Sequence, residues 1–382
     1  MPGGIELLAA GPWIVAAVLF PLMLLHRSRV RRYPRLSADA APFVSIIVPA
    51  RNEAENIGAC VATLVNSEYP ALEVIVVDDQ STDGTAEVVR IIAERSAGRV
   101  RLVEGESPPA GWIGKSWACW QGYQAARGTV LLFTDADTRH DDALLGHAVG
   151  ALHATSADLL SVLPRQRMIT FWERVVLPQI FTLIILRFHD VDRVSRARRP
   201  RDVIANGQYM LFTRAAYQAV GGHEAVHDDV VEDLALAQRI IAAGRNLRLA
   251  HADDMMEVRM YRSLGGIMEG WTKNLALGSR RTVRPLLAPL VPWVLAAFTF
   301  AAWVLPPALL VLSLVSPVGD SLRGWTLPVT AASVVTWALV HLAMRIPPQH
   351  ALLYPLGAAV ITLLFVKSGA RGSRVVWRGR EY

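Results

Sequence analysis

The sequence predicts an α/β fold with a mainly parallel sheet, flanked at both ends by segments that enter a membrane. Its middle part alternates between short apolar runs rich in β-branched residues and amphipathic stretches, the pattern of strands joined by helices. Hydrophobic residues make up 52% of the 382 residues and charged residues only 19%, and this apolar excess lies at the two ends. We therefore expect a membrane anchor with a basic linker at 1–40, an α/β domain at 41–284, and a transmembrane region with a basic tail at 285–382.

The N-terminal end is a nearly unbroken apolar run at 5–25, which is long enough to cross the hydrocarbon core of a bilayer. Arginines without any acid among them follow it, at positions 27, 29, 31, 32 and 35. A secretory signal peptide carries its positive charge before the apolar region, whereas here the charge comes after it. We expect an uncleaved anchor that leaves the following domain in the cytoplasm.

The middle part begins with a regular alternation of strands and helices. Strands are predicted at 43–48, 72–77, 100–103 and 129–133, the first of them ending at Pro49. Helices are predicted at about 52–66, 85–95 and 116–126. Right-handed crossovers between parallel strands bring the carboxyl ends of the strands to one edge, where open α/β sheets bind ligands.

Beyond Asp141 the pattern is less regular. The stretch 171–188 is long enough to span a membrane, but it contains charges and Pro178, so we favour a helix in the membrane interface or buried in the domain. Helices are expected at 230–243 and 263–277, and strands at 246–250 and 255–260.

Three apolar runs close the chain, at 286–315, 327–344 and 351–366. Three simple spans would place the basic tail outside, against the positive-inside rule. One of the runs is therefore expected to form a hairpin or to lie in the interface, and the sequence leaves open which one.

Charge and cysteine content narrow the expected partners. The net charge of +6 comes mostly from arginines beside the apolar ends, which favours a membrane surface over nucleic acid as the partner. The two cysteines, Cys60 and Cys119, each lie inside a helical pattern. They are expected to be buried free thiols, with no support for a disulfide or a zinc site.

A pair of carboxylates follows the strand at 129–133. Asp135 and Asp137 are spaced i, i+2 in a tight turn, so both can reach one hard cation, and Mg²⁺ or Mn²⁺ held by few carboxylates usually bridges to phosphate oxygens. A solvated acidic turn that caps the next helix explains the pair equally well when it is considered alone.

Three more features point to the same kind of site. Asp78 and Asp79 close the strand at 72–77, where a base and a ribose could be held. Lys115 follows a glycine-bearing loop at a helix start, a natural place for a diphosphate, and Glu232 with Asp233 offers a carboxylate that could deprotonate a hydroxyl. Each feature also has a plain alternative. Asp78 and Asp79 could belong to a helix-capping turn, and Lys115 could be a solvated lysine. Glu232 and Asp233 could be first-turn acids favoured by the helix dipole.

Four ordered motifs within about 43–277 resemble the family 2 glycosyltransferases of the GT-A fold. The motifs are 44–53 (VSIIVPARNE), 76–85 (VVDDQSTDGT), 134–137 (TDAD) and 231–233 (VED). The resemblance implies a GT-A fold with a mixed, mainly parallel sheet and a nucleotide-diphospho-sugar donor, with UDP expected. It further implies a divalent metal, Mg²⁺ or Mn²⁺, and an inverting single displacement.

Carried over by motif, Asp233 would be the general base, Asp137 with Asp135 would hold the metal and the diphosphate, and Asp79 would contact the nucleotide base. The other substrate-binding residues are expected to be Pro49, Arg51, Glu53, Lys115 and Trp271. Arg51 stands where other members often have an aromatic residue.

The helix around Trp271 bears on the acceptor. Processive synthases of this family carry a Gln/Arg-x-x-Arg-Trp motif after the base; here Trp271 is present and the preceding arginine is not. Together with 258–263 and 377–380, this makes the chain look more like bacterial carotenoid- and hopanoid-associated glycosyltransferases. We therefore expect a lipid acceptor and a multi-pass protein of the inner membrane with a cytoplasmic catalytic domain.

Two alternatives stay open at this point. One is a polyprenyl-phosphate glycosyltransferase or a polysaccharide synthase, and the other is a non-catalytic membrane scaffold that has kept the fold. The intact acids in all three acidic motifs speak against the scaffold.

Overall fold

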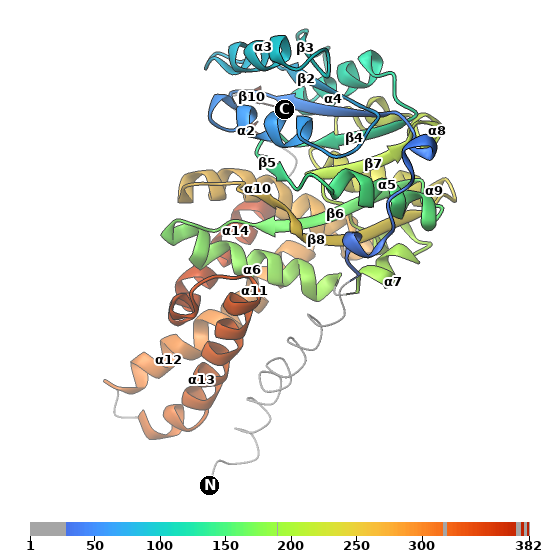
Figure 1. The fold of residues 1–382 in the computed structure, drawn as a ribbon. Helices are drawn as coiled ribbons and strands as arrows, with labels where there is room; N and C mark the ends of the chain where they lie inside the picture. The colour runs from blue at the N-terminus through green and yellow to red at the C-terminus, as the bar shows by residue number, and fades with distance from the viewer. Residues whose placement is uncertain (1–27, 189, 316–318, 372–375, 378–379, 382) are drawn as a thin grey trace. The chain divides into compact units, whose positions relative to one another are not determined.

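The computed structural model describes residues 28–188, 190–315, 319–371, 376–377 and 380–381 (Figure 1). These residues form two compact units, each assembled from separate stretches of the chain. We name them the sheet unit (28–167 and 190–260) and the helical unit (168–188 and 261–381). The expected anchor at 5–25 lies outside the described residues, and the linear boundaries at 40 and 284 stay a prediction.

The sheet unit is built on eight strands in the order β3-β2-β1-β4-β7-β6-β8-β5. Their bounds are β1 Val44–Ala50, β2 Leu72–Asp78, β3 Val100–Glu104, β4 Val130–Thr134, β5 Thr138–His140, β6 Leu159–Gln166, β7 Tyr209–Thr213 and β8 Leu247–Val258. β1 to β4 pair in parallel, as do β6 and β8, whereas β7 runs antiparallel to both of its neighbours and β5 to β8. The prediction of a mixed, mainly parallel sheet is confirmed.

Helices connect and cover these strands (Figure 1). The α-helices of the sheet unit are α2 Ala54–Val65, α3 Thr85–Arg95, α4 Gly114–Ala125, α5 Leu144–Ala154, α7 Val191–Ser195, α8 Arg214–Ala219 and α9 Glu232–Ala242. Short 3-10 turns lie at η1 Val30–Arg32, η2 Ala38–Ala40, η3 Pro200–Asp202 and η4 Gly222–Val226. The free, buried cysteines predicted from the sequence are confirmed on α2 and α4.

A buried polar group fixes the amino ends of the central strands. Glu73 in β2 is 1% exposed and accepts hydrogen bonds from Ser45 Oγ at 2.6 Å and from the Arg127 backbone N–H at 2.9 Å. Burial alone would raise the pKa of Glu73, but these bonds and the Arg127 guanidinium lower it. The group ties β1, β2 and the start of β4 together, so their carboxyl ends emerge at one edge.

Three strand predictions need correction. β1 does not end at Pro49 but continues to Ala50, which is tolerated because its pairing with β4 stops at Ile47, before the proline. The strands expected at 246–250 and 255–260 are one long strand, β8, whose register against β6 shifts between Pro164 and Arg165. β5, β6 and β7 were not predicted.

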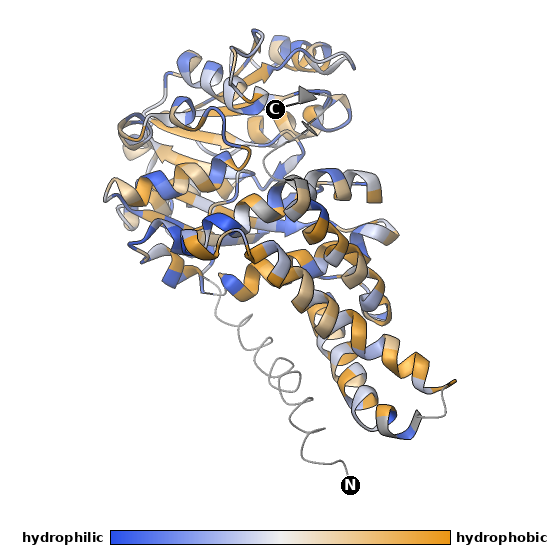
Figure 2. Ribbon diagram, turned by 180° about the vertical axis from the view of Figure 1, so that it is seen from behind, coloured by the Kyte–Doolittle hydropathy of each residue, from blue (hydrophilic) through white to orange (hydrophobic). Residues whose placement is uncertain are grey.

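The helical unit contains the C-terminal apolar segments. Its elements are α6 Phe171–Arg187, α10 Leu264–Arg281, η5 Pro285–Leu287, α11 Val291–Thr299, the π-helical turn η6 Phe300–Val304, α12 Leu305–Ser313, α13 Gly319–Ala343, η7 Pro348–Leu353, α14 Tyr354–Arg371, β9 Val376–Trp377 and β10 Arg380–Glu381. Three stretches are long and apolar enough to cross a membrane: Val291–Ser313, Leu322–Ala343 and Pro348–Ala370. Large hydrophobic side chains lie exposed along them, as expected for lipid-facing helices. Hydrophobic residues are frequent in these helices (Figure 2).

The stretch expected to lie in the interface or to be buried is α6, which packs within the helical unit. Gln179 on α6 is fully buried, and its Nε2 donates to the carbonyl oxygen of Tyr354 at 2.7 Å. Gly357 allows α14 this close approach, because a Cβ there would lie 2.1 Å from the carbonyl oxygen of Val175.

Candidate active site

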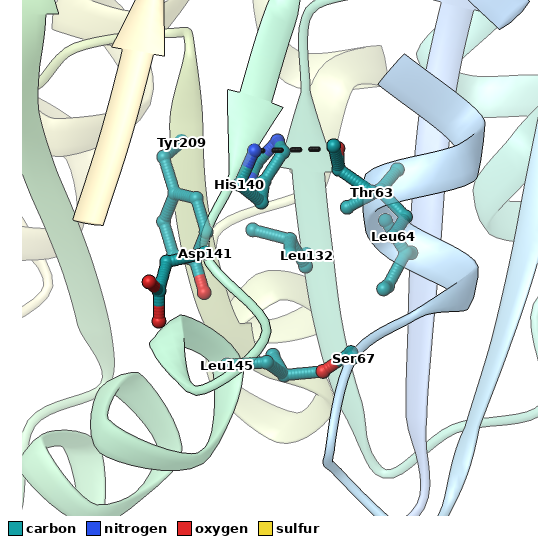
Figure 3. A pocket seen from close by; sticks show the side chains of 9 residues that line it. Thr63, Leu64, Ser67, Leu132, His140, Asp141, Leu145 and Tyr209 are labelled. Carbon is teal, nitrogen blue, oxygen red and sulfur yellow. Dashed lines mark hydrogen bonds between the residues drawn. The ribbon is translucent and has the colours of Figure 1, made fainter. Parts of the chain in front are cut away.

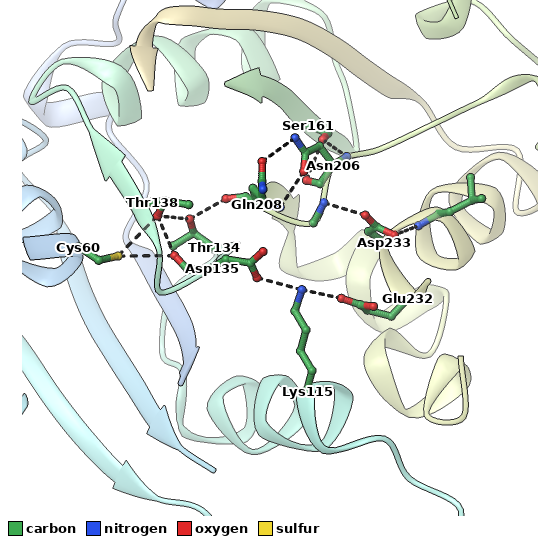
Figure 4. Close-up of polar contacts among 12 residues, drawn as sticks. Cys60, Lys115, Thr134, Asp135, Thr138, Ser161, Asn206, Gln208, Glu232 and Asp233 are labelled. Atoms are coloured by element: carbon green, nitrogen blue, oxygen red, sulfur yellow. Dashed lines mark hydrogen bonds and ion pairs between the residues drawn. The ribbon is translucent and has the colours of Figure 1, made fainter. Parts of the chain in front are cut away.

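Four of the predicted site residues meet at the carboxyl edge of the sheet (Figure 4). Lys115 is in the first turn of α4, Asp135 follows β4, and Glu232 and Asp233 open α9. The sequence folds this way locally because β4 ends at Thr134, where its buried apolar run gives way to acids. The two helices present their amino ends, which favour negative charge, to the same place.

Lys115 is the centre of the group. Its Nζ lies 2.9 Å from Asp135 Oδ1 and 2.8 Å from Glu232 Oε1, so one ammonium joins the turn after β4 to the start of α9. Burial works against a charged lysine, but these two carboxylates hold the pKa of Lys115 well above its usual value. In return, Lys115 lowers the pKa of Glu232 although burial opposes this.

Asp233 has a different environment from its neighbour. Its Oδ2 accepts a hydrogen bond from the Gly207 N–H at 2.9 Å and its Oδ1 one from the Leu234 N–H at 2.7 Å. Burial and then the charge of Glu232 raise the pKa of Asp233 to about 6, against the effect of Lys115 and the two N–H groups. A carboxylate with a pKa close to neutrality suits a general base.

Residues 206–208 connect Asp233 to the turn after β4. The Gln208 carbonyl oxygen accepts a hydrogen bond from Thr134 Oγ1 at 2.7 Å, directly before Asp135. The Asn206 backbone N–H donates to Ser161 Oγ at 2.8 Å, which fixes the other end of the segment. A Cβ on Gly207 would lie 3.2 Å from Asp233 Oδ2 and 3.4 Å from Lys115 Nζ, so only glycine fits here without displacement.

Sequence reasoning missed Gly207, whereas Thr134 was already part of the TDAD motif. The only available signal was a glycine between two amides directly before an apolar run, which does not identify a partner for Asp233.

Asp137 is the predicted metal ligand, and its surroundings fit a cation. Its Oδ1 is buried and has no hydrogen-bond partner among the described residues. Burial, then Asp135, then Glu53 raise the pKa of Asp137 to about 8. Among the residues that the structure describes, no group of three or more His, Cys, Asp or Glu side chains is arranged as a metal site. Mg²⁺ and Mn²⁺ sites completed by substrate phosphates need only one or two carboxylates, so these donors fit such a metal.

A polar layer supports the turn that carries Asp135. Thr138 Oγ1 donates to the Asp135 carbonyl oxygen at 2.7 Å and lies 2.8 Å from His140 Nε2. Burial lowers the pKa of His140 to about 3, so this imidazole is neutral. Beside it lies a cavity of about 10 Å³ (Figure 3), room for about one water. The Tyr209 hydroxyl, on a residue that lines the cavity, is buried and has no hydrogen-bond partner in the described part of the chain.

The residues predicted to contact the nucleotide lie at the ends of β1 and β2. Asp79 is 3% exposed, and Arg51 Nη1 donates to its carbonyl oxygen at 2.5 Å and lies 3.7 Å from its Oδ2. Pro49 pairs with Val77 in the parallel ladder beside them. β1 lies between β2 and β4, so the strand ends that precede Asp79 and Asp135 are two strand spacings apart, about 10 Å.

Trp271 is not part of the sheet unit. It lies on α10 of the helical unit, 7% exposed, with its ring edge-on to Phe181 at 5.8 Å. Its contact with substrate stays a prediction.

Residues 45–221 match the model of the family described as "Glycosyl transferase family 2". These residues form a family 2 glycosyltransferase domain. It contains Asp79, Lys115, Asp135 and Asp137 of the predicted site, whereas Asp233 lies after its end.

Relatives extend the match beyond the family 2 domain. The chain is 29% identical over 351 residues to the 4,4'-diaponeurosporenoate glycosyltransferase of Staphylococcus aureus (strain MRSA252), with 89% of this chain and 88% of the relative covered. The enzyme of that name from strain bovine RF122 / ET3-1 is 28% identical over 348 residues, at 89% and 88% coverage. The chain is a glycosyltransferase.

A solved structure supports the fold. The mannosyltransferase PcManGT from Pyrobaculum calidifontis, in complex with GDP-Man and Mn²⁺, matches with a TM-score of 0.54 and 24% identity, covering 87% of this chain and 97% of that one. The GT-A fold predicted from the motifs is confirmed.

We expect Gly207→Ala to slow sugar transfer about tenfold. The new Cβ would meet Asp233 Oδ2 at 3.2 Å and shift the carboxylate by a few tenths of an ångström, and a misplacement of a reacting group by about 1 Å costs about a hundredfold. The measurement is kcat at saturating donor, with donor affinity and the thermal unfolding midpoint as controls. Donor affinity should change less than kcat. A variant with the wild-type kcat would show that Gly207 does not position Asp233.

Proposed function

We propose that this chain transfers a sugar, with inversion, from a nucleotide-diphospho-sugar to a lipid acceptor in the membrane. The observation that carries the proposal is the contact of Lys115 with both Asp135 and Glu232. This contact brings Asp135, which is expected to face the donor, close to the start of α9, where Asp233 lies. The acceptor class is supported by the relatives, which are named for a carotenoid carboxylate.

The donor lies along the carboxyl edge from β2 to β4 in this proposal. Asp79, oriented by Arg51, contacts the base, which we expect to be uracil. Pro49 and Glu53 line the same edge, and Lys115 faces the diphosphate. Lys115 supplies positive charge where negative charge develops on the leaving group.

Asp137 and Asp135 would hold a divalent metal, Mg²⁺ or Mn²⁺. When bound, the metal neutralises charge on the departing diphosphate. The unpartnered Asp137 oxygen and the raised pKa of Asp137 support this assignment.

Asp233 is the general base of the proposed reaction. The Gly207 N–H orients its carboxylate, and Glu232 is engaged by Lys115, so the two adjacent acids have separate tasks. A hydroxyl acceptor must lose a proton as it attacks, and Asp233 accepts it. A carboxylate acceptor arrives without that proton and depends less on Asp233.

The membrane part of the proposal starts from the three apolar segments of the helical unit, which associate the chain with a membrane. We propose a multi-pass protein of the inner membrane with the sheet unit in the cytoplasm. Such an arrangement keeps an apolar acceptor within reach of a water-soluble donor.

The metal assignment predicts that Asp137→Asn removes both metal-dependent turnover and metal-dependent stabilisation. A ligand at a hundred times its Kd stabilises the native state by about 2.7 kcal/mol, so wild-type protein should unfold at a higher temperature when Mn²⁺ and UDP are added. Asp137→Asn should not show this increase, whereas Asp142→Asn, at an exposed neighbouring acid, should show it in full. Normal stabilisation and turnover of Asp137→Asn at limiting Mn²⁺ would refute the assignment.

The base assignment predicts that Asp233→Asn binds the donor with nearly unchanged affinity but transfers sugar to a hydroxyl acceptor at least about a hundredfold more slowly. Glu232→Gln should be milder. The wild-type rate should also fall as the pH drops below about 6, where Asp233 becomes protonated. The residual rate of Asp233→Asn should not show this fall at low pH. The assay uses paired hydroxyl and carboxylate acceptors, with the smaller loss expected for the carboxylate. Near-wild-type transfer to the hydroxyl by Asp233→Asn would place the base elsewhere.

The proposed orientation predicts that a reporter inserted after Arg35 faces the cytoplasm, because the arginines after the first apolar run stay inside. Paired reporters that work only inside or only outside the membrane measure this. Activity of the outside-only reporter at that position would overturn the orientation.

A further inference from the structure

Two arginine-rich segments that are far apart in the sequence lie side by side on β8. The first is 28–32, which enters the sheet unit through η1, and the second is 191–199, which contains α7. Both segments bond to the amino half of the same strand (Figure 1): the His251 N–H donates to the Ser28 carbonyl oxygen at 2.8 Å, and the Leu249 N–H to Ser195 Oγ at 3.0 Å.

A single side chain joins the two segments. Arg248 Nη2 donates to Ser28 Oγ at 2.5 Å and to Asp192 Oδ1 at 2.7 Å. The start of the linker and the start of α7 are thus within reach of one guanidinium, and their charged side chains share one region of the sheet unit.

This region is strongly basic. The two segments contain seven arginines and one acid, Asp192, and that acid is already paired with Arg248. On β8, Asp254 lies 3.5 Å from Arg31 and Asp253 4.0 Å from Arg29, which offsets only part of the charge. We define the basic surface as the six arginines of these segments that are exposed: Arg31, Arg32, Arg193, Arg196, Arg198 and Arg199.

We propose that the basic surface binds the anionic headgroups of the membrane that holds the chain. Charge complementarity is one reason, since each arginine near an anionic lipid surface strengthens local binding about fivefold. The position of the surface is the other. Only two residues separate the apolar run at 5–25 from Ser28, so Ser28 lies at most about 11 Å from the end of the predicted anchor.

The second segment, 191–199, adds something that the arginines next to the predicted anchor do not provide. Arg193, Arg196 and Arg199 belong to the folded sheet unit, so their contact with headgroups restricts the orientation of the sheet unit and not only its distance from the bilayer. The proposal rests on the predicted anchor and does not depend on which sugar or lipid reacts.

The test uses the full chain in nanodiscs of phosphatidylcholine, with or without phosphatidylglycerol. A fluorophore on Ala197→Cys, in the middle of the second segment, reports shielding from the neutral quencher acrylamide. Phosphatidylglycerol should increase the shielding, and high salt should reverse the increase. Adding Arg193→Gln, Arg196→Gln and Arg199→Gln should weaken the local contact about a hundredfold and abolish the phosphatidylglycerol effect.

A matched control carries Arg90→Gln, Arg95→Gln and Arg99→Gln with the same label. These residues lie on α3 and just before β3, six strand spacings or about 29 Å from β8, well beyond the screening length of about 8 Å. The control should keep the full phosphatidylglycerol effect. Shielding that is independent of phosphatidylglycerol, or lost equally in both triple variants, would overturn the proposal.

Discussion

The site depends on one lysine, whose positive charge compensates the negative charge of several neighbouring carboxylates. Lys115 contacts Asp135 and Glu232 directly, while Asp137 and Asp233 lie close enough for their pKa values to respond to it. Two unit charges 4 Å apart interact by about 4 kcal/mol at the effective dielectric near a protein surface, so these carboxylates would repel one another strongly without the ammonium. A single positive charge does not balance them all. Burial and the neighbouring acids Asp135 and Glu53 raise the pKa of Asp137 to about 8, and the proposed metal would offset this repulsion.

The antiparallel strand β7 makes this arrangement possible. It lies between β4 and β6, so the segment that enters it arrives at the carboxyl end of β4. Residues 206–208 therefore touch Thr134 on one side and Asp233 on the other. A purely parallel sheet would have placed a strand's amino end at the opposite edge, and no backbone N–H from such a segment would have reached Asp233.

The sequence was sufficient for the strands that are long, apolar and β-branched, and for the charged residues that directly follow them. β1 to β4 and the acids after them belong to this class. β5 has only three residues, β7 has only five, and β8 is interrupted by polar residues opposite a shift in register, so no periodic signal identified them. The hydrogen bond from Gly207 to Asp233 joins positions 26 residues apart, and only the folded sheet brings them together.

The contrast between Glu232 and Asp233 shows how the fold assigns tasks to neighbouring acids. Successive side chains on a helix diverge by about 100°, so Glu232 turns to Lys115 and Asp233 to Gly207. The lysine lowers the pKa of the first, and burial with that neighbouring charge raises the pKa of the second to about 6. Pairs of acids whose pKa values are pushed apart in this way separate a charge-holding role from a proton-accepting one. Lys115 pairs with Glu232 and so joins the start of α9 to Asp135. Asp233 is thereby left as the carboxylate suited to take a proton.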